Sequence, residues 1–501
     1  MEAPSILAHT RPKKGVLSLS TIASNPRASR PPLILGVLAL GGGAYALLQS
    51  LVVPALPVLQ RDLHTSTAGV AWVFTSYLLA ASVVTPIAGR LGDMFGKKRV
   101  LVVTLSGLAA GTLLGAIVTS LPLMIVARTI QGLGGAIFPL AFGILRDEFP
   151  RERVAGAIAL VSGLLGIGGG LGIVLAGPIL QHLSYHWLFW IPLVATAVAA
   201  VAAIVFIPES TIREPGNVHW LGGLLLSAWL VALLVAVSEG STWGWGSAKT
   251  IGLIVVSGVA AVAWVRAESR SRHPLVDMKM MRLSGVWTTN TAALLIGFGM
   301  YSAFILIPQF VQAPRSTGYG FGASVTQSGL FLVPTTIALL ITSPISGRLS
   351  NVVGSKVPLV LGTIVTTVAF VVLAVAGSRW EIYLASTLVG IGVGFAFASM
   401  ANLIVEAVPP GQTGVATGMN TIVRTIGGAI GAVVAASVLA AHVLASGDAE
   451  KRGYTITFWI CVAVLLIGVL ASLAVPGRGL RQARSMELVD PGLVSDSRKV
   501  A

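Results

Sequence analysis

The sequence contains little charge. Only 10% of its 501 residues are Asp, Glu, Lys or Arg, whereas 55% are hydrophobic, and the mean hydropathy is +0.88. A soluble domain of ordinary composition carries about 25% charged residues. A chain this apolar cannot bury its hydrophobic surface in one aqueous core, so lipid must be most of its solvent.

Cysteine is nearly absent. Cys461 is the only one, and it lies inside the apolar run FWICVAVLLIGVL. A single cysteine excludes a disulfide framework within the chain, and the seven histidines show no ligand spacing, so we predict no metal site. A phosphate-cradling P-loop is also missing, which excludes a nucleotide as the energy source on this chain. We therefore expect no cofactor.

Acids are fewer than bases, 18 against 33, which gives a formal net charge of +15. The bases lie in short segments between apolar runs, as orientation signals do, and this argues against nucleic acid as a partner. With the N-terminus inside, the inner segments hold roughly four times as many Lys and Arg as the outer loops. We expect a multi-pass protein of a bacterial plasma membrane with both termini in the cytoplasm.

Apolar runs of the length that a bilayer core requires, about 20 residues, recur fourteen times. They lack the alternation of a membrane β-barrel, so the predicted fold class is an all-α membrane protein with 14 transmembrane helices. The predicted spans are 33–56, 69–89, 100–119, 121–145, 154–180, 187–207, 218–238, 249–266, 286–311, 325–346, 357–377, 381–404, 414–444 and 454–475.

One predicted hairpin, GRLGDMFGKKRV at 89–100, concentrates charge between two apolar runs. Gly89 and Gly96 permit a tight turn, and Asp93 can cap a helix start or meet the positive end of a neighbouring helix. Such a charged clasp can bias which face of a protein is open. The bases are expected to bind lipid phosphates: Arg90, Lys97, Lys98 and Arg99.

A weaker copy of this hairpin, GRLSNVVGSK at 347–356, lies at the corresponding place in the second half of the chain. Asn351 stands there where the first copy has Asp93. Repeats of supersecondary structure are common in transporters.

The pattern G-x-x-x-D-x-x-G-[KR]-[KR] resembles the signature loop of the major facilitator superfamily, and fourteen spans resemble its multidrug:proton antiporter branch. Four other stretches are similar to motifs of that family: ARTIQGLGGA (127–136), IPQFVQ (307–312), QSGLFLVP (327–334) and QTGVATGMNTIVRTIGGAIG (412–431).

The resemblance implies two six-helix bundles that rock around a central cavity, with two inserted helices between them. The chain then divides into a cytoplasmic tail (1–32), an N-terminal bundle (33–207), the inserted helices with their loops (208–285), a C-terminal bundle (286–476) and a second cytoplasmic tail (477–501).

Two arginines lie inside predicted spans, Arg128 in the fourth and Arg424 in the thirteenth. A guanidinium at membrane depth costs about 2.5 kcal/mol or more and usually faces a cavity or a partner. Gln131 lies one turn after Arg128. The resemblance implies that Arg128 relays protons or tunes a nearby acid; the alternative is a structural arginine bonded to backbone carbonyls. For Arg424 both alternatives stay open.

The fifth span, SGLLGIGGGLGIVLAGPILQHL at 162–183, is rich in glycine, which lets helices approach closely. It resembles the antiporter motif of exporters, although Ile173 stands where that motif has a spacing glycine. The resemblance implies a pliant hinge at Gly172, Gly177 and Pro178. Tight packing alone is the alternative.

The first span, GGGAYALLQSLVVPALP at 41–57, lacks an acid. The branch usually has one seven residues before A-L-P, and Leu48 stands there. Proton coupling needs a group in the cavity that gains and loses a proton. Three explanations stay open: Asp93, Glu239 or His182 carries the proton, coupling is weak, or the charge of the substrate drives the cycle.

The cavity is predicted to have few fixed charges, which suits bulky amphipathic or cationic molecules. Its polar lining is predicted to include Tyr45, Gln49, Asn290, Tyr301 and Gln327, although helix–helix hydrogen bonding explains each equally well.

The sequence therefore predicts a secondary active transporter that exports amphipathic or cationic small molecules, a multidrug efflux antiporter driven by the proton gradient. We expect a lipid-embedded monomer and no enzyme. The alternatives are a facilitator or importer of a lipid or metabolite, and a non-transporting sensor on the same fold.

Overall fold

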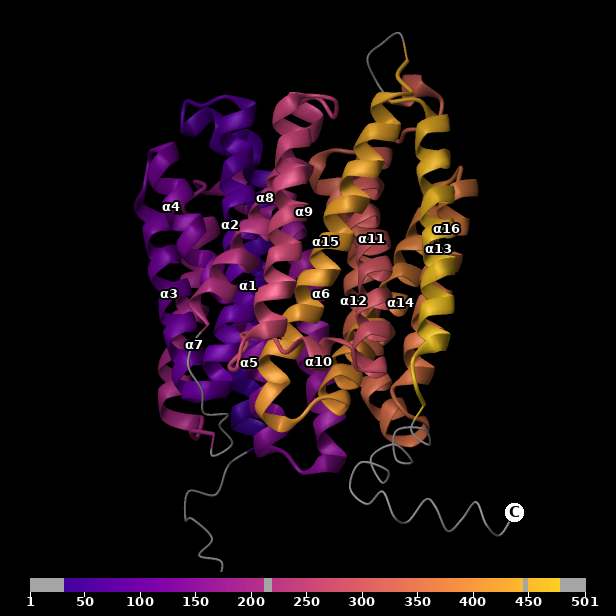
Figure 1. Cartoon of the computed structure of the whole chain (residues 1–501). Helices are drawn as coiled ribbons and strands as arrows, with labels where there is room; N and C mark the ends of the chain where they lie inside the picture. Colours follow the sequence, from indigo (N-terminus) through magenta and orange to yellow (C-terminus); the bar gives the residue numbers. More distant parts are fainter. Residues whose placement is uncertain (1–30, 211–218, 445–448, 478–501) are drawn as a thin grey trace, which may run out of the picture.

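The computed structural model of the chain describes residues 31–210, 219–444 and 449–477. Within these ranges it consists of long α-helices that stand side by side (Figure 1), and its only β-structure is one isolated bridge between Val443 and Ala449. The predicted all-α class is confirmed.

The helices follow the predicted division of the chain. The first bundle contains α1 (Pro31–Asp62), α2 (Thr67–Phe95), α3 (Lys97–Ile117), α4 (Leu121–Gln131), η1 (Gly132–Ala136), α5 (Ile137–Glu148), α6 (Arg151–His182) and α7 (Trp187–Phe206). The next segment contains α8 (Trp220–Trp243), α9 (Ala248–Arg270) and α10 (Met278–Met281). The second bundle contains α11 (Ser284–Gln312), η2 (Arg315–Thr317), α12 (Val325–Val353), α13 (Lys356–Val375), α14 (Arg379–Ala407), η3 (Pro410–Gln412), α15 (Thr413–Ala440) and α16 (Lys451–Ala474).

Among the described residues, thirteen helical segments are long and apolar enough to cross a membrane. The helix α6, with 32 residues, occupies the remaining predicted span. The fold therefore has 14 transmembrane helices. Because this number is even, α1 begins and α16 ends at the same end of the molecule, the lower end in Figure 1.

The fourth span differs from the prediction because it is not one continuous α-helix. It tightens to a 3-10 helix at η1, GLGGA, between α4 and α5. A Cβ atom on Gly132 would lie 2.9 Å from the backbone nitrogen of Ala81, and one on Gly135 would lie 3.0 Å from the carbonyl oxygen of Ala81. Glycine therefore lets this segment press against α2, which brings the two walls of the later site together.

The predicted hairpin at 89–100 is also different in structure. The helix α2 continues to Phe95, α3 begins at Lys97, and only Gly96 separates them, with a φ of +111° that favours glycine. Gly89 and Asp93 therefore lie in the last turns of a helix. The helices extend beyond the apolar runs because their polar ends pack against other helices.

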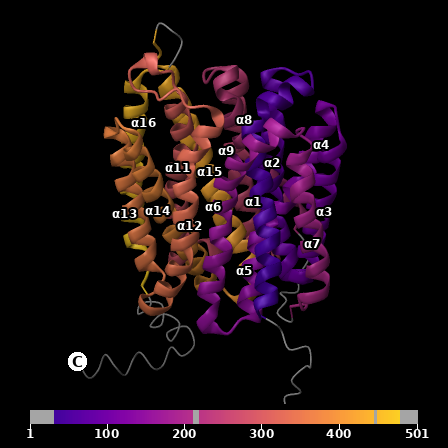
Figure 2. The ribbon, with the colours of Figure 1, turned by 180° about the vertical axis from the view of Figure 1, so that it is seen from behind.

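Each bundle has its own hydrophobic core, and a third cluster joins the inserted helices to the second bundle. This third cluster contains Leu226 and Leu230 of α8, Trp264 of α9, and Val415 and Met419 of α15. The pair α8 and α9 lies in front of the boundary between the bundles (Figure 1). On the other side, α6 lies between α1 and α12 (Figure 2).

Two seams join the bundles at the end where α1 begins. In the first, α2 crosses the start of α15 so closely that a Cβ atom on Gly89 would lie 2.5 Å from the carbonyl oxygen of Gly414. In the second, the end of α12 crosses the start of α6, and a Cβ atom on Gly347 would lie 2.8 Å from the Cα atom of Gly156. Gly89 and Gly347 open the two copies of the repeated motif, so the internal repeat builds both seams.

Hydrogen bonds across the seams reinforce this end, which we call the clasped end. Arg146 Nη1 of α5 donates to Thr413 Oγ1 of α15 at 2.7 Å, and Asn351 Nδ2 donates to the carbonyl oxygen of Glu152 at 2.8 Å. At the opposite end, α6 and α12 still touch, where Gln181 Nε2 donates to Thr326 at 3.3 Å.

Replacing Gly89 with leucine is expected to separate α2 from α15, because the new side chain would overlap the carbonyl group of Gly414. Thr417 is buried near this seam. In a Cys461→Ala background, a Thr417→Cys thiol should react with a maleimide about tenfold faster when Gly89→Leu is present, since tenfold corresponds to about 1.4 kcal/mol in the open–closed equilibrium.

The matched control is Gly43→Leu in α1, because a Cβ atom on Gly43 has no neighbour within 4 Å. This variant should leave the reaction rate unchanged. Equal rates in the two leucine variants would show that the seam does not depend on close approach at Gly89.

Candidate functional site

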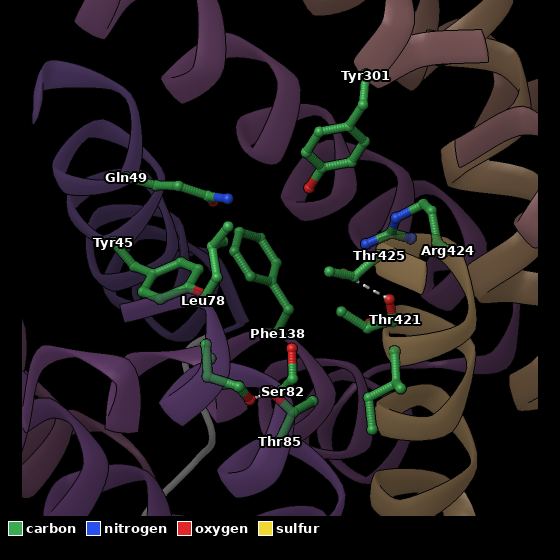
Figure 3. Close-up of a pocket in the computed structure, with 13 residues that line it drawn as sticks. Tyr45, Gln49, Leu78, Ser82, Thr85, Phe138, Tyr301, Thr421, Arg424 and Thr425 are labelled. Carbon is green, nitrogen blue, oxygen red and sulfur yellow. Dashed lines mark hydrogen bonds between the residues drawn. The ribbon is translucent and has the colours of Figure 1, made fainter. Parts of the chain in front are cut away.

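A central cavity lies between the two bundles, at the level of η1. Its walls come from α1, α2, η1 and α5 on one side and from α11 and α15 on the other (Figure 3). The lining residues are Tyr45, Gln49, Leu78, Ala81, Ser82, Thr85, Gly135, Phe138, Tyr301, Thr421, Ile422, Arg424 and Thr425. Three of the five residues predicted as polar lining are among them: Tyr45, Gln49 and Tyr301.

The other two predicted lining residues lie elsewhere. Asn290 Oδ1 accepts a hydrogen bond of 2.9 Å from Asn420 Nδ2, which joins α11 to α15. Gln327 forms a capping box with Ser324 at the start of α12, with bonds of 3.1 Å and 3.2 Å. Their placement agrees with the alternative, helix packing and capping, and the S-x-x-Q spacing at 324–327 is itself a capping signal.

Arg128 is fully buried inside the first bundle. Its Nε donates to the carbonyl oxygen of Val73 at 3.0 Å and its Nη1 donates to Gln131 Oε1 at 2.5 Å. Gln131 Nε2 in turn donates to the carbonyl oxygen of Gly111 at 3.1 Å. No described carboxylate pairs with Arg128, and its Nη2 has no hydrogen-bond partner among the described residues. This network ties α4 to α2 and α3.

An aromatic layer separates Arg128 from the cavity. The guanidinium carbon lies 4.2 Å from the ring centroid of Tyr77, a cation–π contact. The ring of Tyr77 stacks on Tyr45 at 5.7 Å, and Tyr45 meets Phe138 edge to face at 6.1 Å. Arg128 therefore adds positive charge behind the wall without touching the space itself.

Arg424 faces the cavity directly, with 8% of its surface exposed. Its guanidinium carbon lies 4.3 Å from the ring centroid of Phe397. Among the described residues, no acceptor receives a hydrogen bond from its side chain and no carboxylate pairs with it. It also lines a smaller neighbouring cavity together with Phe142, Ser162, Phe397, Ala401, Thr417, Asn420 and Thr421.

The signature acid reaches across the clasped end. The carboxylate of Asp93 accepts hydrogen bonds from the backbone nitrogens of Gly414 at 3.3 Å and Val415 at 3.2 Å, at the start of α15. Asp93 itself is fully buried. An anion at a helix N-terminus meets unsatisfied N–H groups and the positive end of the helix dipole, so this carboxylate holds the two bundles together.

The expected contact of Lys97 with lipid phosphate is wrong. Its ammonium is fully buried, 2.8 Å from Asp147 Oδ2 and 3.8 Å from Asp93 Oδ1. Burial of a charge is tolerated when opposite charges surround it. Asp147 comes from α5, fifty residues along the chain, and nothing in the hairpin sequence announces it.

The next two bases also have protein partners. Lys98 Nζ donates to the carbonyl oxygen of Ile204 at 2.8 Å. Arg99, whose side chain is 70% exposed, pairs with Glu209 at 3.4 Å. Gly96 lies against the same Glu209, because a side chain there would collide with its carboxylate. These contacts fasten the α2–α3 connection to the segment after α7.

The predicted hinge in α6 faces two directions. Gly172 packs against Ser50 of α1, whereas a Cβ atom on Gly177 would lie 2.7 Å from Thr326 Oγ1 of α12. The helix runs without a break through Pro178. Glycines thus let α6 approach a helix of each bundle; the side chain of Ile173 lies outside the described residues.

The position of the missing acid is filled by hydrocarbon. Leu48 is fully buried in the core of the first bundle. The other candidate proton carriers, Glu239 on α8 and His182 at the end of α6, are not among the lining residues. In the part of the chain that the structure describes, neither cavity is lined by an Asp, a Glu or a His.

Comparison with known proteins agrees with this fold. The Tetracenomycin C resistance and export protein of Streptomyces glaucescens is 29% identical over 423 residues, covering 83% of this chain and 75% of that protein. Multidrug resistance protein 3 of Bacillus subtilis is also 29% identical, covering 79% and 76%. An uncharacterised transporter of Mycobacterium tuberculosis is 31% identical over 77% of this chain but only 55% of its own length.

A solved structure, the human organic anion transporter MFSD10, superposes with a TM-score of 0.63 over 88% of this chain and 99% of that chain; at 16% identity it shows the fold alone. The family model described as Major Facilitator Superfamily matches residues 38–432 and again residues 289–490. Because the first match alone covers most of the chain, this protein belongs to the major facilitator superfamily.

Proposed function

We propose that this transporter exports amphipathic small molecules from a bacterial cell by alternating access, with the proton gradient as its energy source. The observation that carries the proposal is a polar, partly aromatic cavity between two bundles that are clasped at one end. The names of its relatives, which refer to resistance, export and multidrug resistance, support efflux as the direction.

The clasped end is assigned to the cytoplasm. The signature bases lie at this end, as the positive-inside rule expects of cytoplasmic segments. In this arrangement the structure is closed toward the cytoplasm, and both chain termini lie on that side. Cargo would enter the cavity only after the seams at Gly89 and Gly347 had separated.

The carboxylate of Asp93 is the group we assign to proton coupling. Since the cavity lining holds no acid among the described residues, a proton must act at another place. A proton on Asp93 would cancel the charge that holds the start of α15 and would thereby weaken the clasp. Proton arrival would then open the cytoplasmic side.

A facilitator without proton coupling is the second candidate. The burial of Leu48 in hydrocarbon favours it, because the acid that the resemblance implied is absent. The two candidates differ in whether a protonophore abolishes transport.

Inverted vesicles from a pump-deficient bacterium that expresses this chain should accumulate at least one amphipathic dye from a set of anionic, neutral and cationic probes. The cytoplasmic face is outside in such vesicles, so export appears as uptake. Uptake should collapse when a protonophore is added. Uptake that survives the protonophore would favour the facilitator, and vesicles that match the empty-vector control would refute transport.

Asp93→Asn should lower transport about tenfold, because an amide cannot be protonated in the same way and loses the charge-assisted hydrogen bonds to α15, about 1.5–3 kcal/mol in total effect. Dye uptake and membrane level are measured together. Asp62→Asn, at an exposed position near the end of α1, serves as the control and should transport normally. Normal uptake in both variants would remove Asp93 from the mechanism.

Arg128→Ala should reduce both stability and transport. It leaves Gln131 Oε1 and the carbonyl oxygen of Val73 without their donor, and each such loss costs about 1–3 kcal/mol. The thermal unfolding midpoint in detergent should therefore fall, while membrane insertion persists. The exposed Arg61→Ala is the control. An unchanged midpoint with unchanged uptake would contradict the network described for Arg128.

A further inference from the structure

The fixed charge around the central cavity has one sign. Of the lining residues, only Arg424 is ionised at neutral pH. Arg128 lies one aromatic layer behind the wall, under Tyr77 and Tyr45. No acid among the described lining residues balances these two cations. The space between the bundles therefore has a positive potential.

Arg424 is not satisfied by the protein. A guanidinium has five N–H donors in a planar fork, and among the described residues none of them reaches an acceptor. Its contact with Phe397 covers one face of the guanidinium and leaves the donor edge free. A largely buried cation without an acceptor is costly, so an anion brought by the cargo would offset that cost.

Three donor groups converge on this point from both bundles. Gln49 of α1, Tyr301 of α11 and Arg424 of α15 point toward one another across the cavity (Figure 3). Their amide, hydroxyl and guanidinium groups can all donate to one anionic oxygen group. An anion held there would touch both halves of the molecule.

The rest of the lining is apolar or aromatic. Leu78, Phe138 and Ile422 complete the wall beside the ring of Tyr45. Aromatic faces can attract organic cations, but the guanidinium groups of Arg128 and Arg424 already occupy the faces of Tyr77 and Phe397. A cationic cargo would meet like charge in a poorly screened space.

We infer that the cargo is an amphipathic organic anion: an aromatic or alicyclic body with a single carboxylate, sulfonate or phenolate that docks on Arg424. This rests on the proposed transport function and selects between the substrate classes that it leaves open. It replaces the expectation of a cationic cargo.

The test is equilibrium binding of two dyes of matched shape to the full chain in phosphatidylcholine nanodiscs. Fluorescein ethyl ester is a monoanion at mildly alkaline pH, and rhodamine 6G, also an ethyl ester on a xanthene, is a monocation. Fluorescence anisotropy should show the anion binding roughly tenfold more tightly.

Arg424→Gln should abolish most of this preference, whereas Arg424→Lys should keep part of it, because an ammonium retains the charge but loses the fork. Tyr301→Phe removes only a hydroxyl and should weaken the anionic dye without affecting the cationic one. Arg379→Gln, at an exposed arginine of α14, is the matched control and should bind both dyes like the unmodified chain.

The inference is overturned if rhodamine 6G binds as tightly as the anion, if Arg424→Gln keeps the preference with an unchanged unfolding midpoint, or if neither dye binds to the folded chain. Should Arg424→Gln fail to fold, Tyr301→Phe and Arg424→Lys decide the matter. Binding is independent of direction and energy source, so an anion preference without vesicle uptake would refute transport and leave the cavity assignment standing.

Discussion

One carboxylate determines which side of this protein is closed. Asp93 sits at the end of α2 and accepts two backbone hydrogen bonds from the start of α15, in the other bundle. The contact is short because Gly89 and Gly414 allow the two backbones to meet. Lys97 and Asp147 extend the same buried charge network into α3 and α5. Moving α15 away from α2 would disturb all of these groups at once.

The second seam has the same geometry but a different chemistry. Asn351 replaces Asp93 in the repeated motif and donates to a backbone carbonyl oxygen of α6 instead of accepting from backbone nitrogens. A neutral amide does not respond to protons, so only the α2–α15 seam can be controlled by protonation. The inserted helices α8 and α9 pack against α15 beside this seam. Two related seams therefore give the protein one proton-sensitive joint and one insensitive joint.

Much of the fold could be predicted from composition, because hydrocarbon forces every spanning segment to satisfy its own backbone. The helix ends could not. The bases at 97–99 were expected at lipid, but their partners Asp147, Ile204 and Glu209 lie far away in sequence. A local pattern carries no information about such contacts.

The cavity could be predicted only in part. Tyr45, Gln49 and Tyr301 stood out as polar groups within apolar runs, and Thr421 and Thr425 could have been found from their spacing around Arg424. Leu78 and Phe138 could not, because their helices are apolar on every side and the hydrophobic pattern leaves their rotation undefined. Asn290 and Gln327 show the converse: a polar residue in a span can serve helix packing or capping instead of a ligand.

The buried leucine at position 48 fits an exporter whose cargo carries the charge. A monovalent anion that leaves a cell with a negative interior gains about 2.3 kcal/mol per 100 mV, and an exporter that also admits a proton moves two charges in the favourable sense. Bound anion would neutralise Arg424, whereas the empty site would keep its positive charge. The same potential would then draw the empty site back toward the cytoplasm, as far as Arg424 moves within the field. Both halves of the cycle would run downhill without an acid in the first helix, which is why hydrocarbon at Leu48 costs this transporter nothing in driving force.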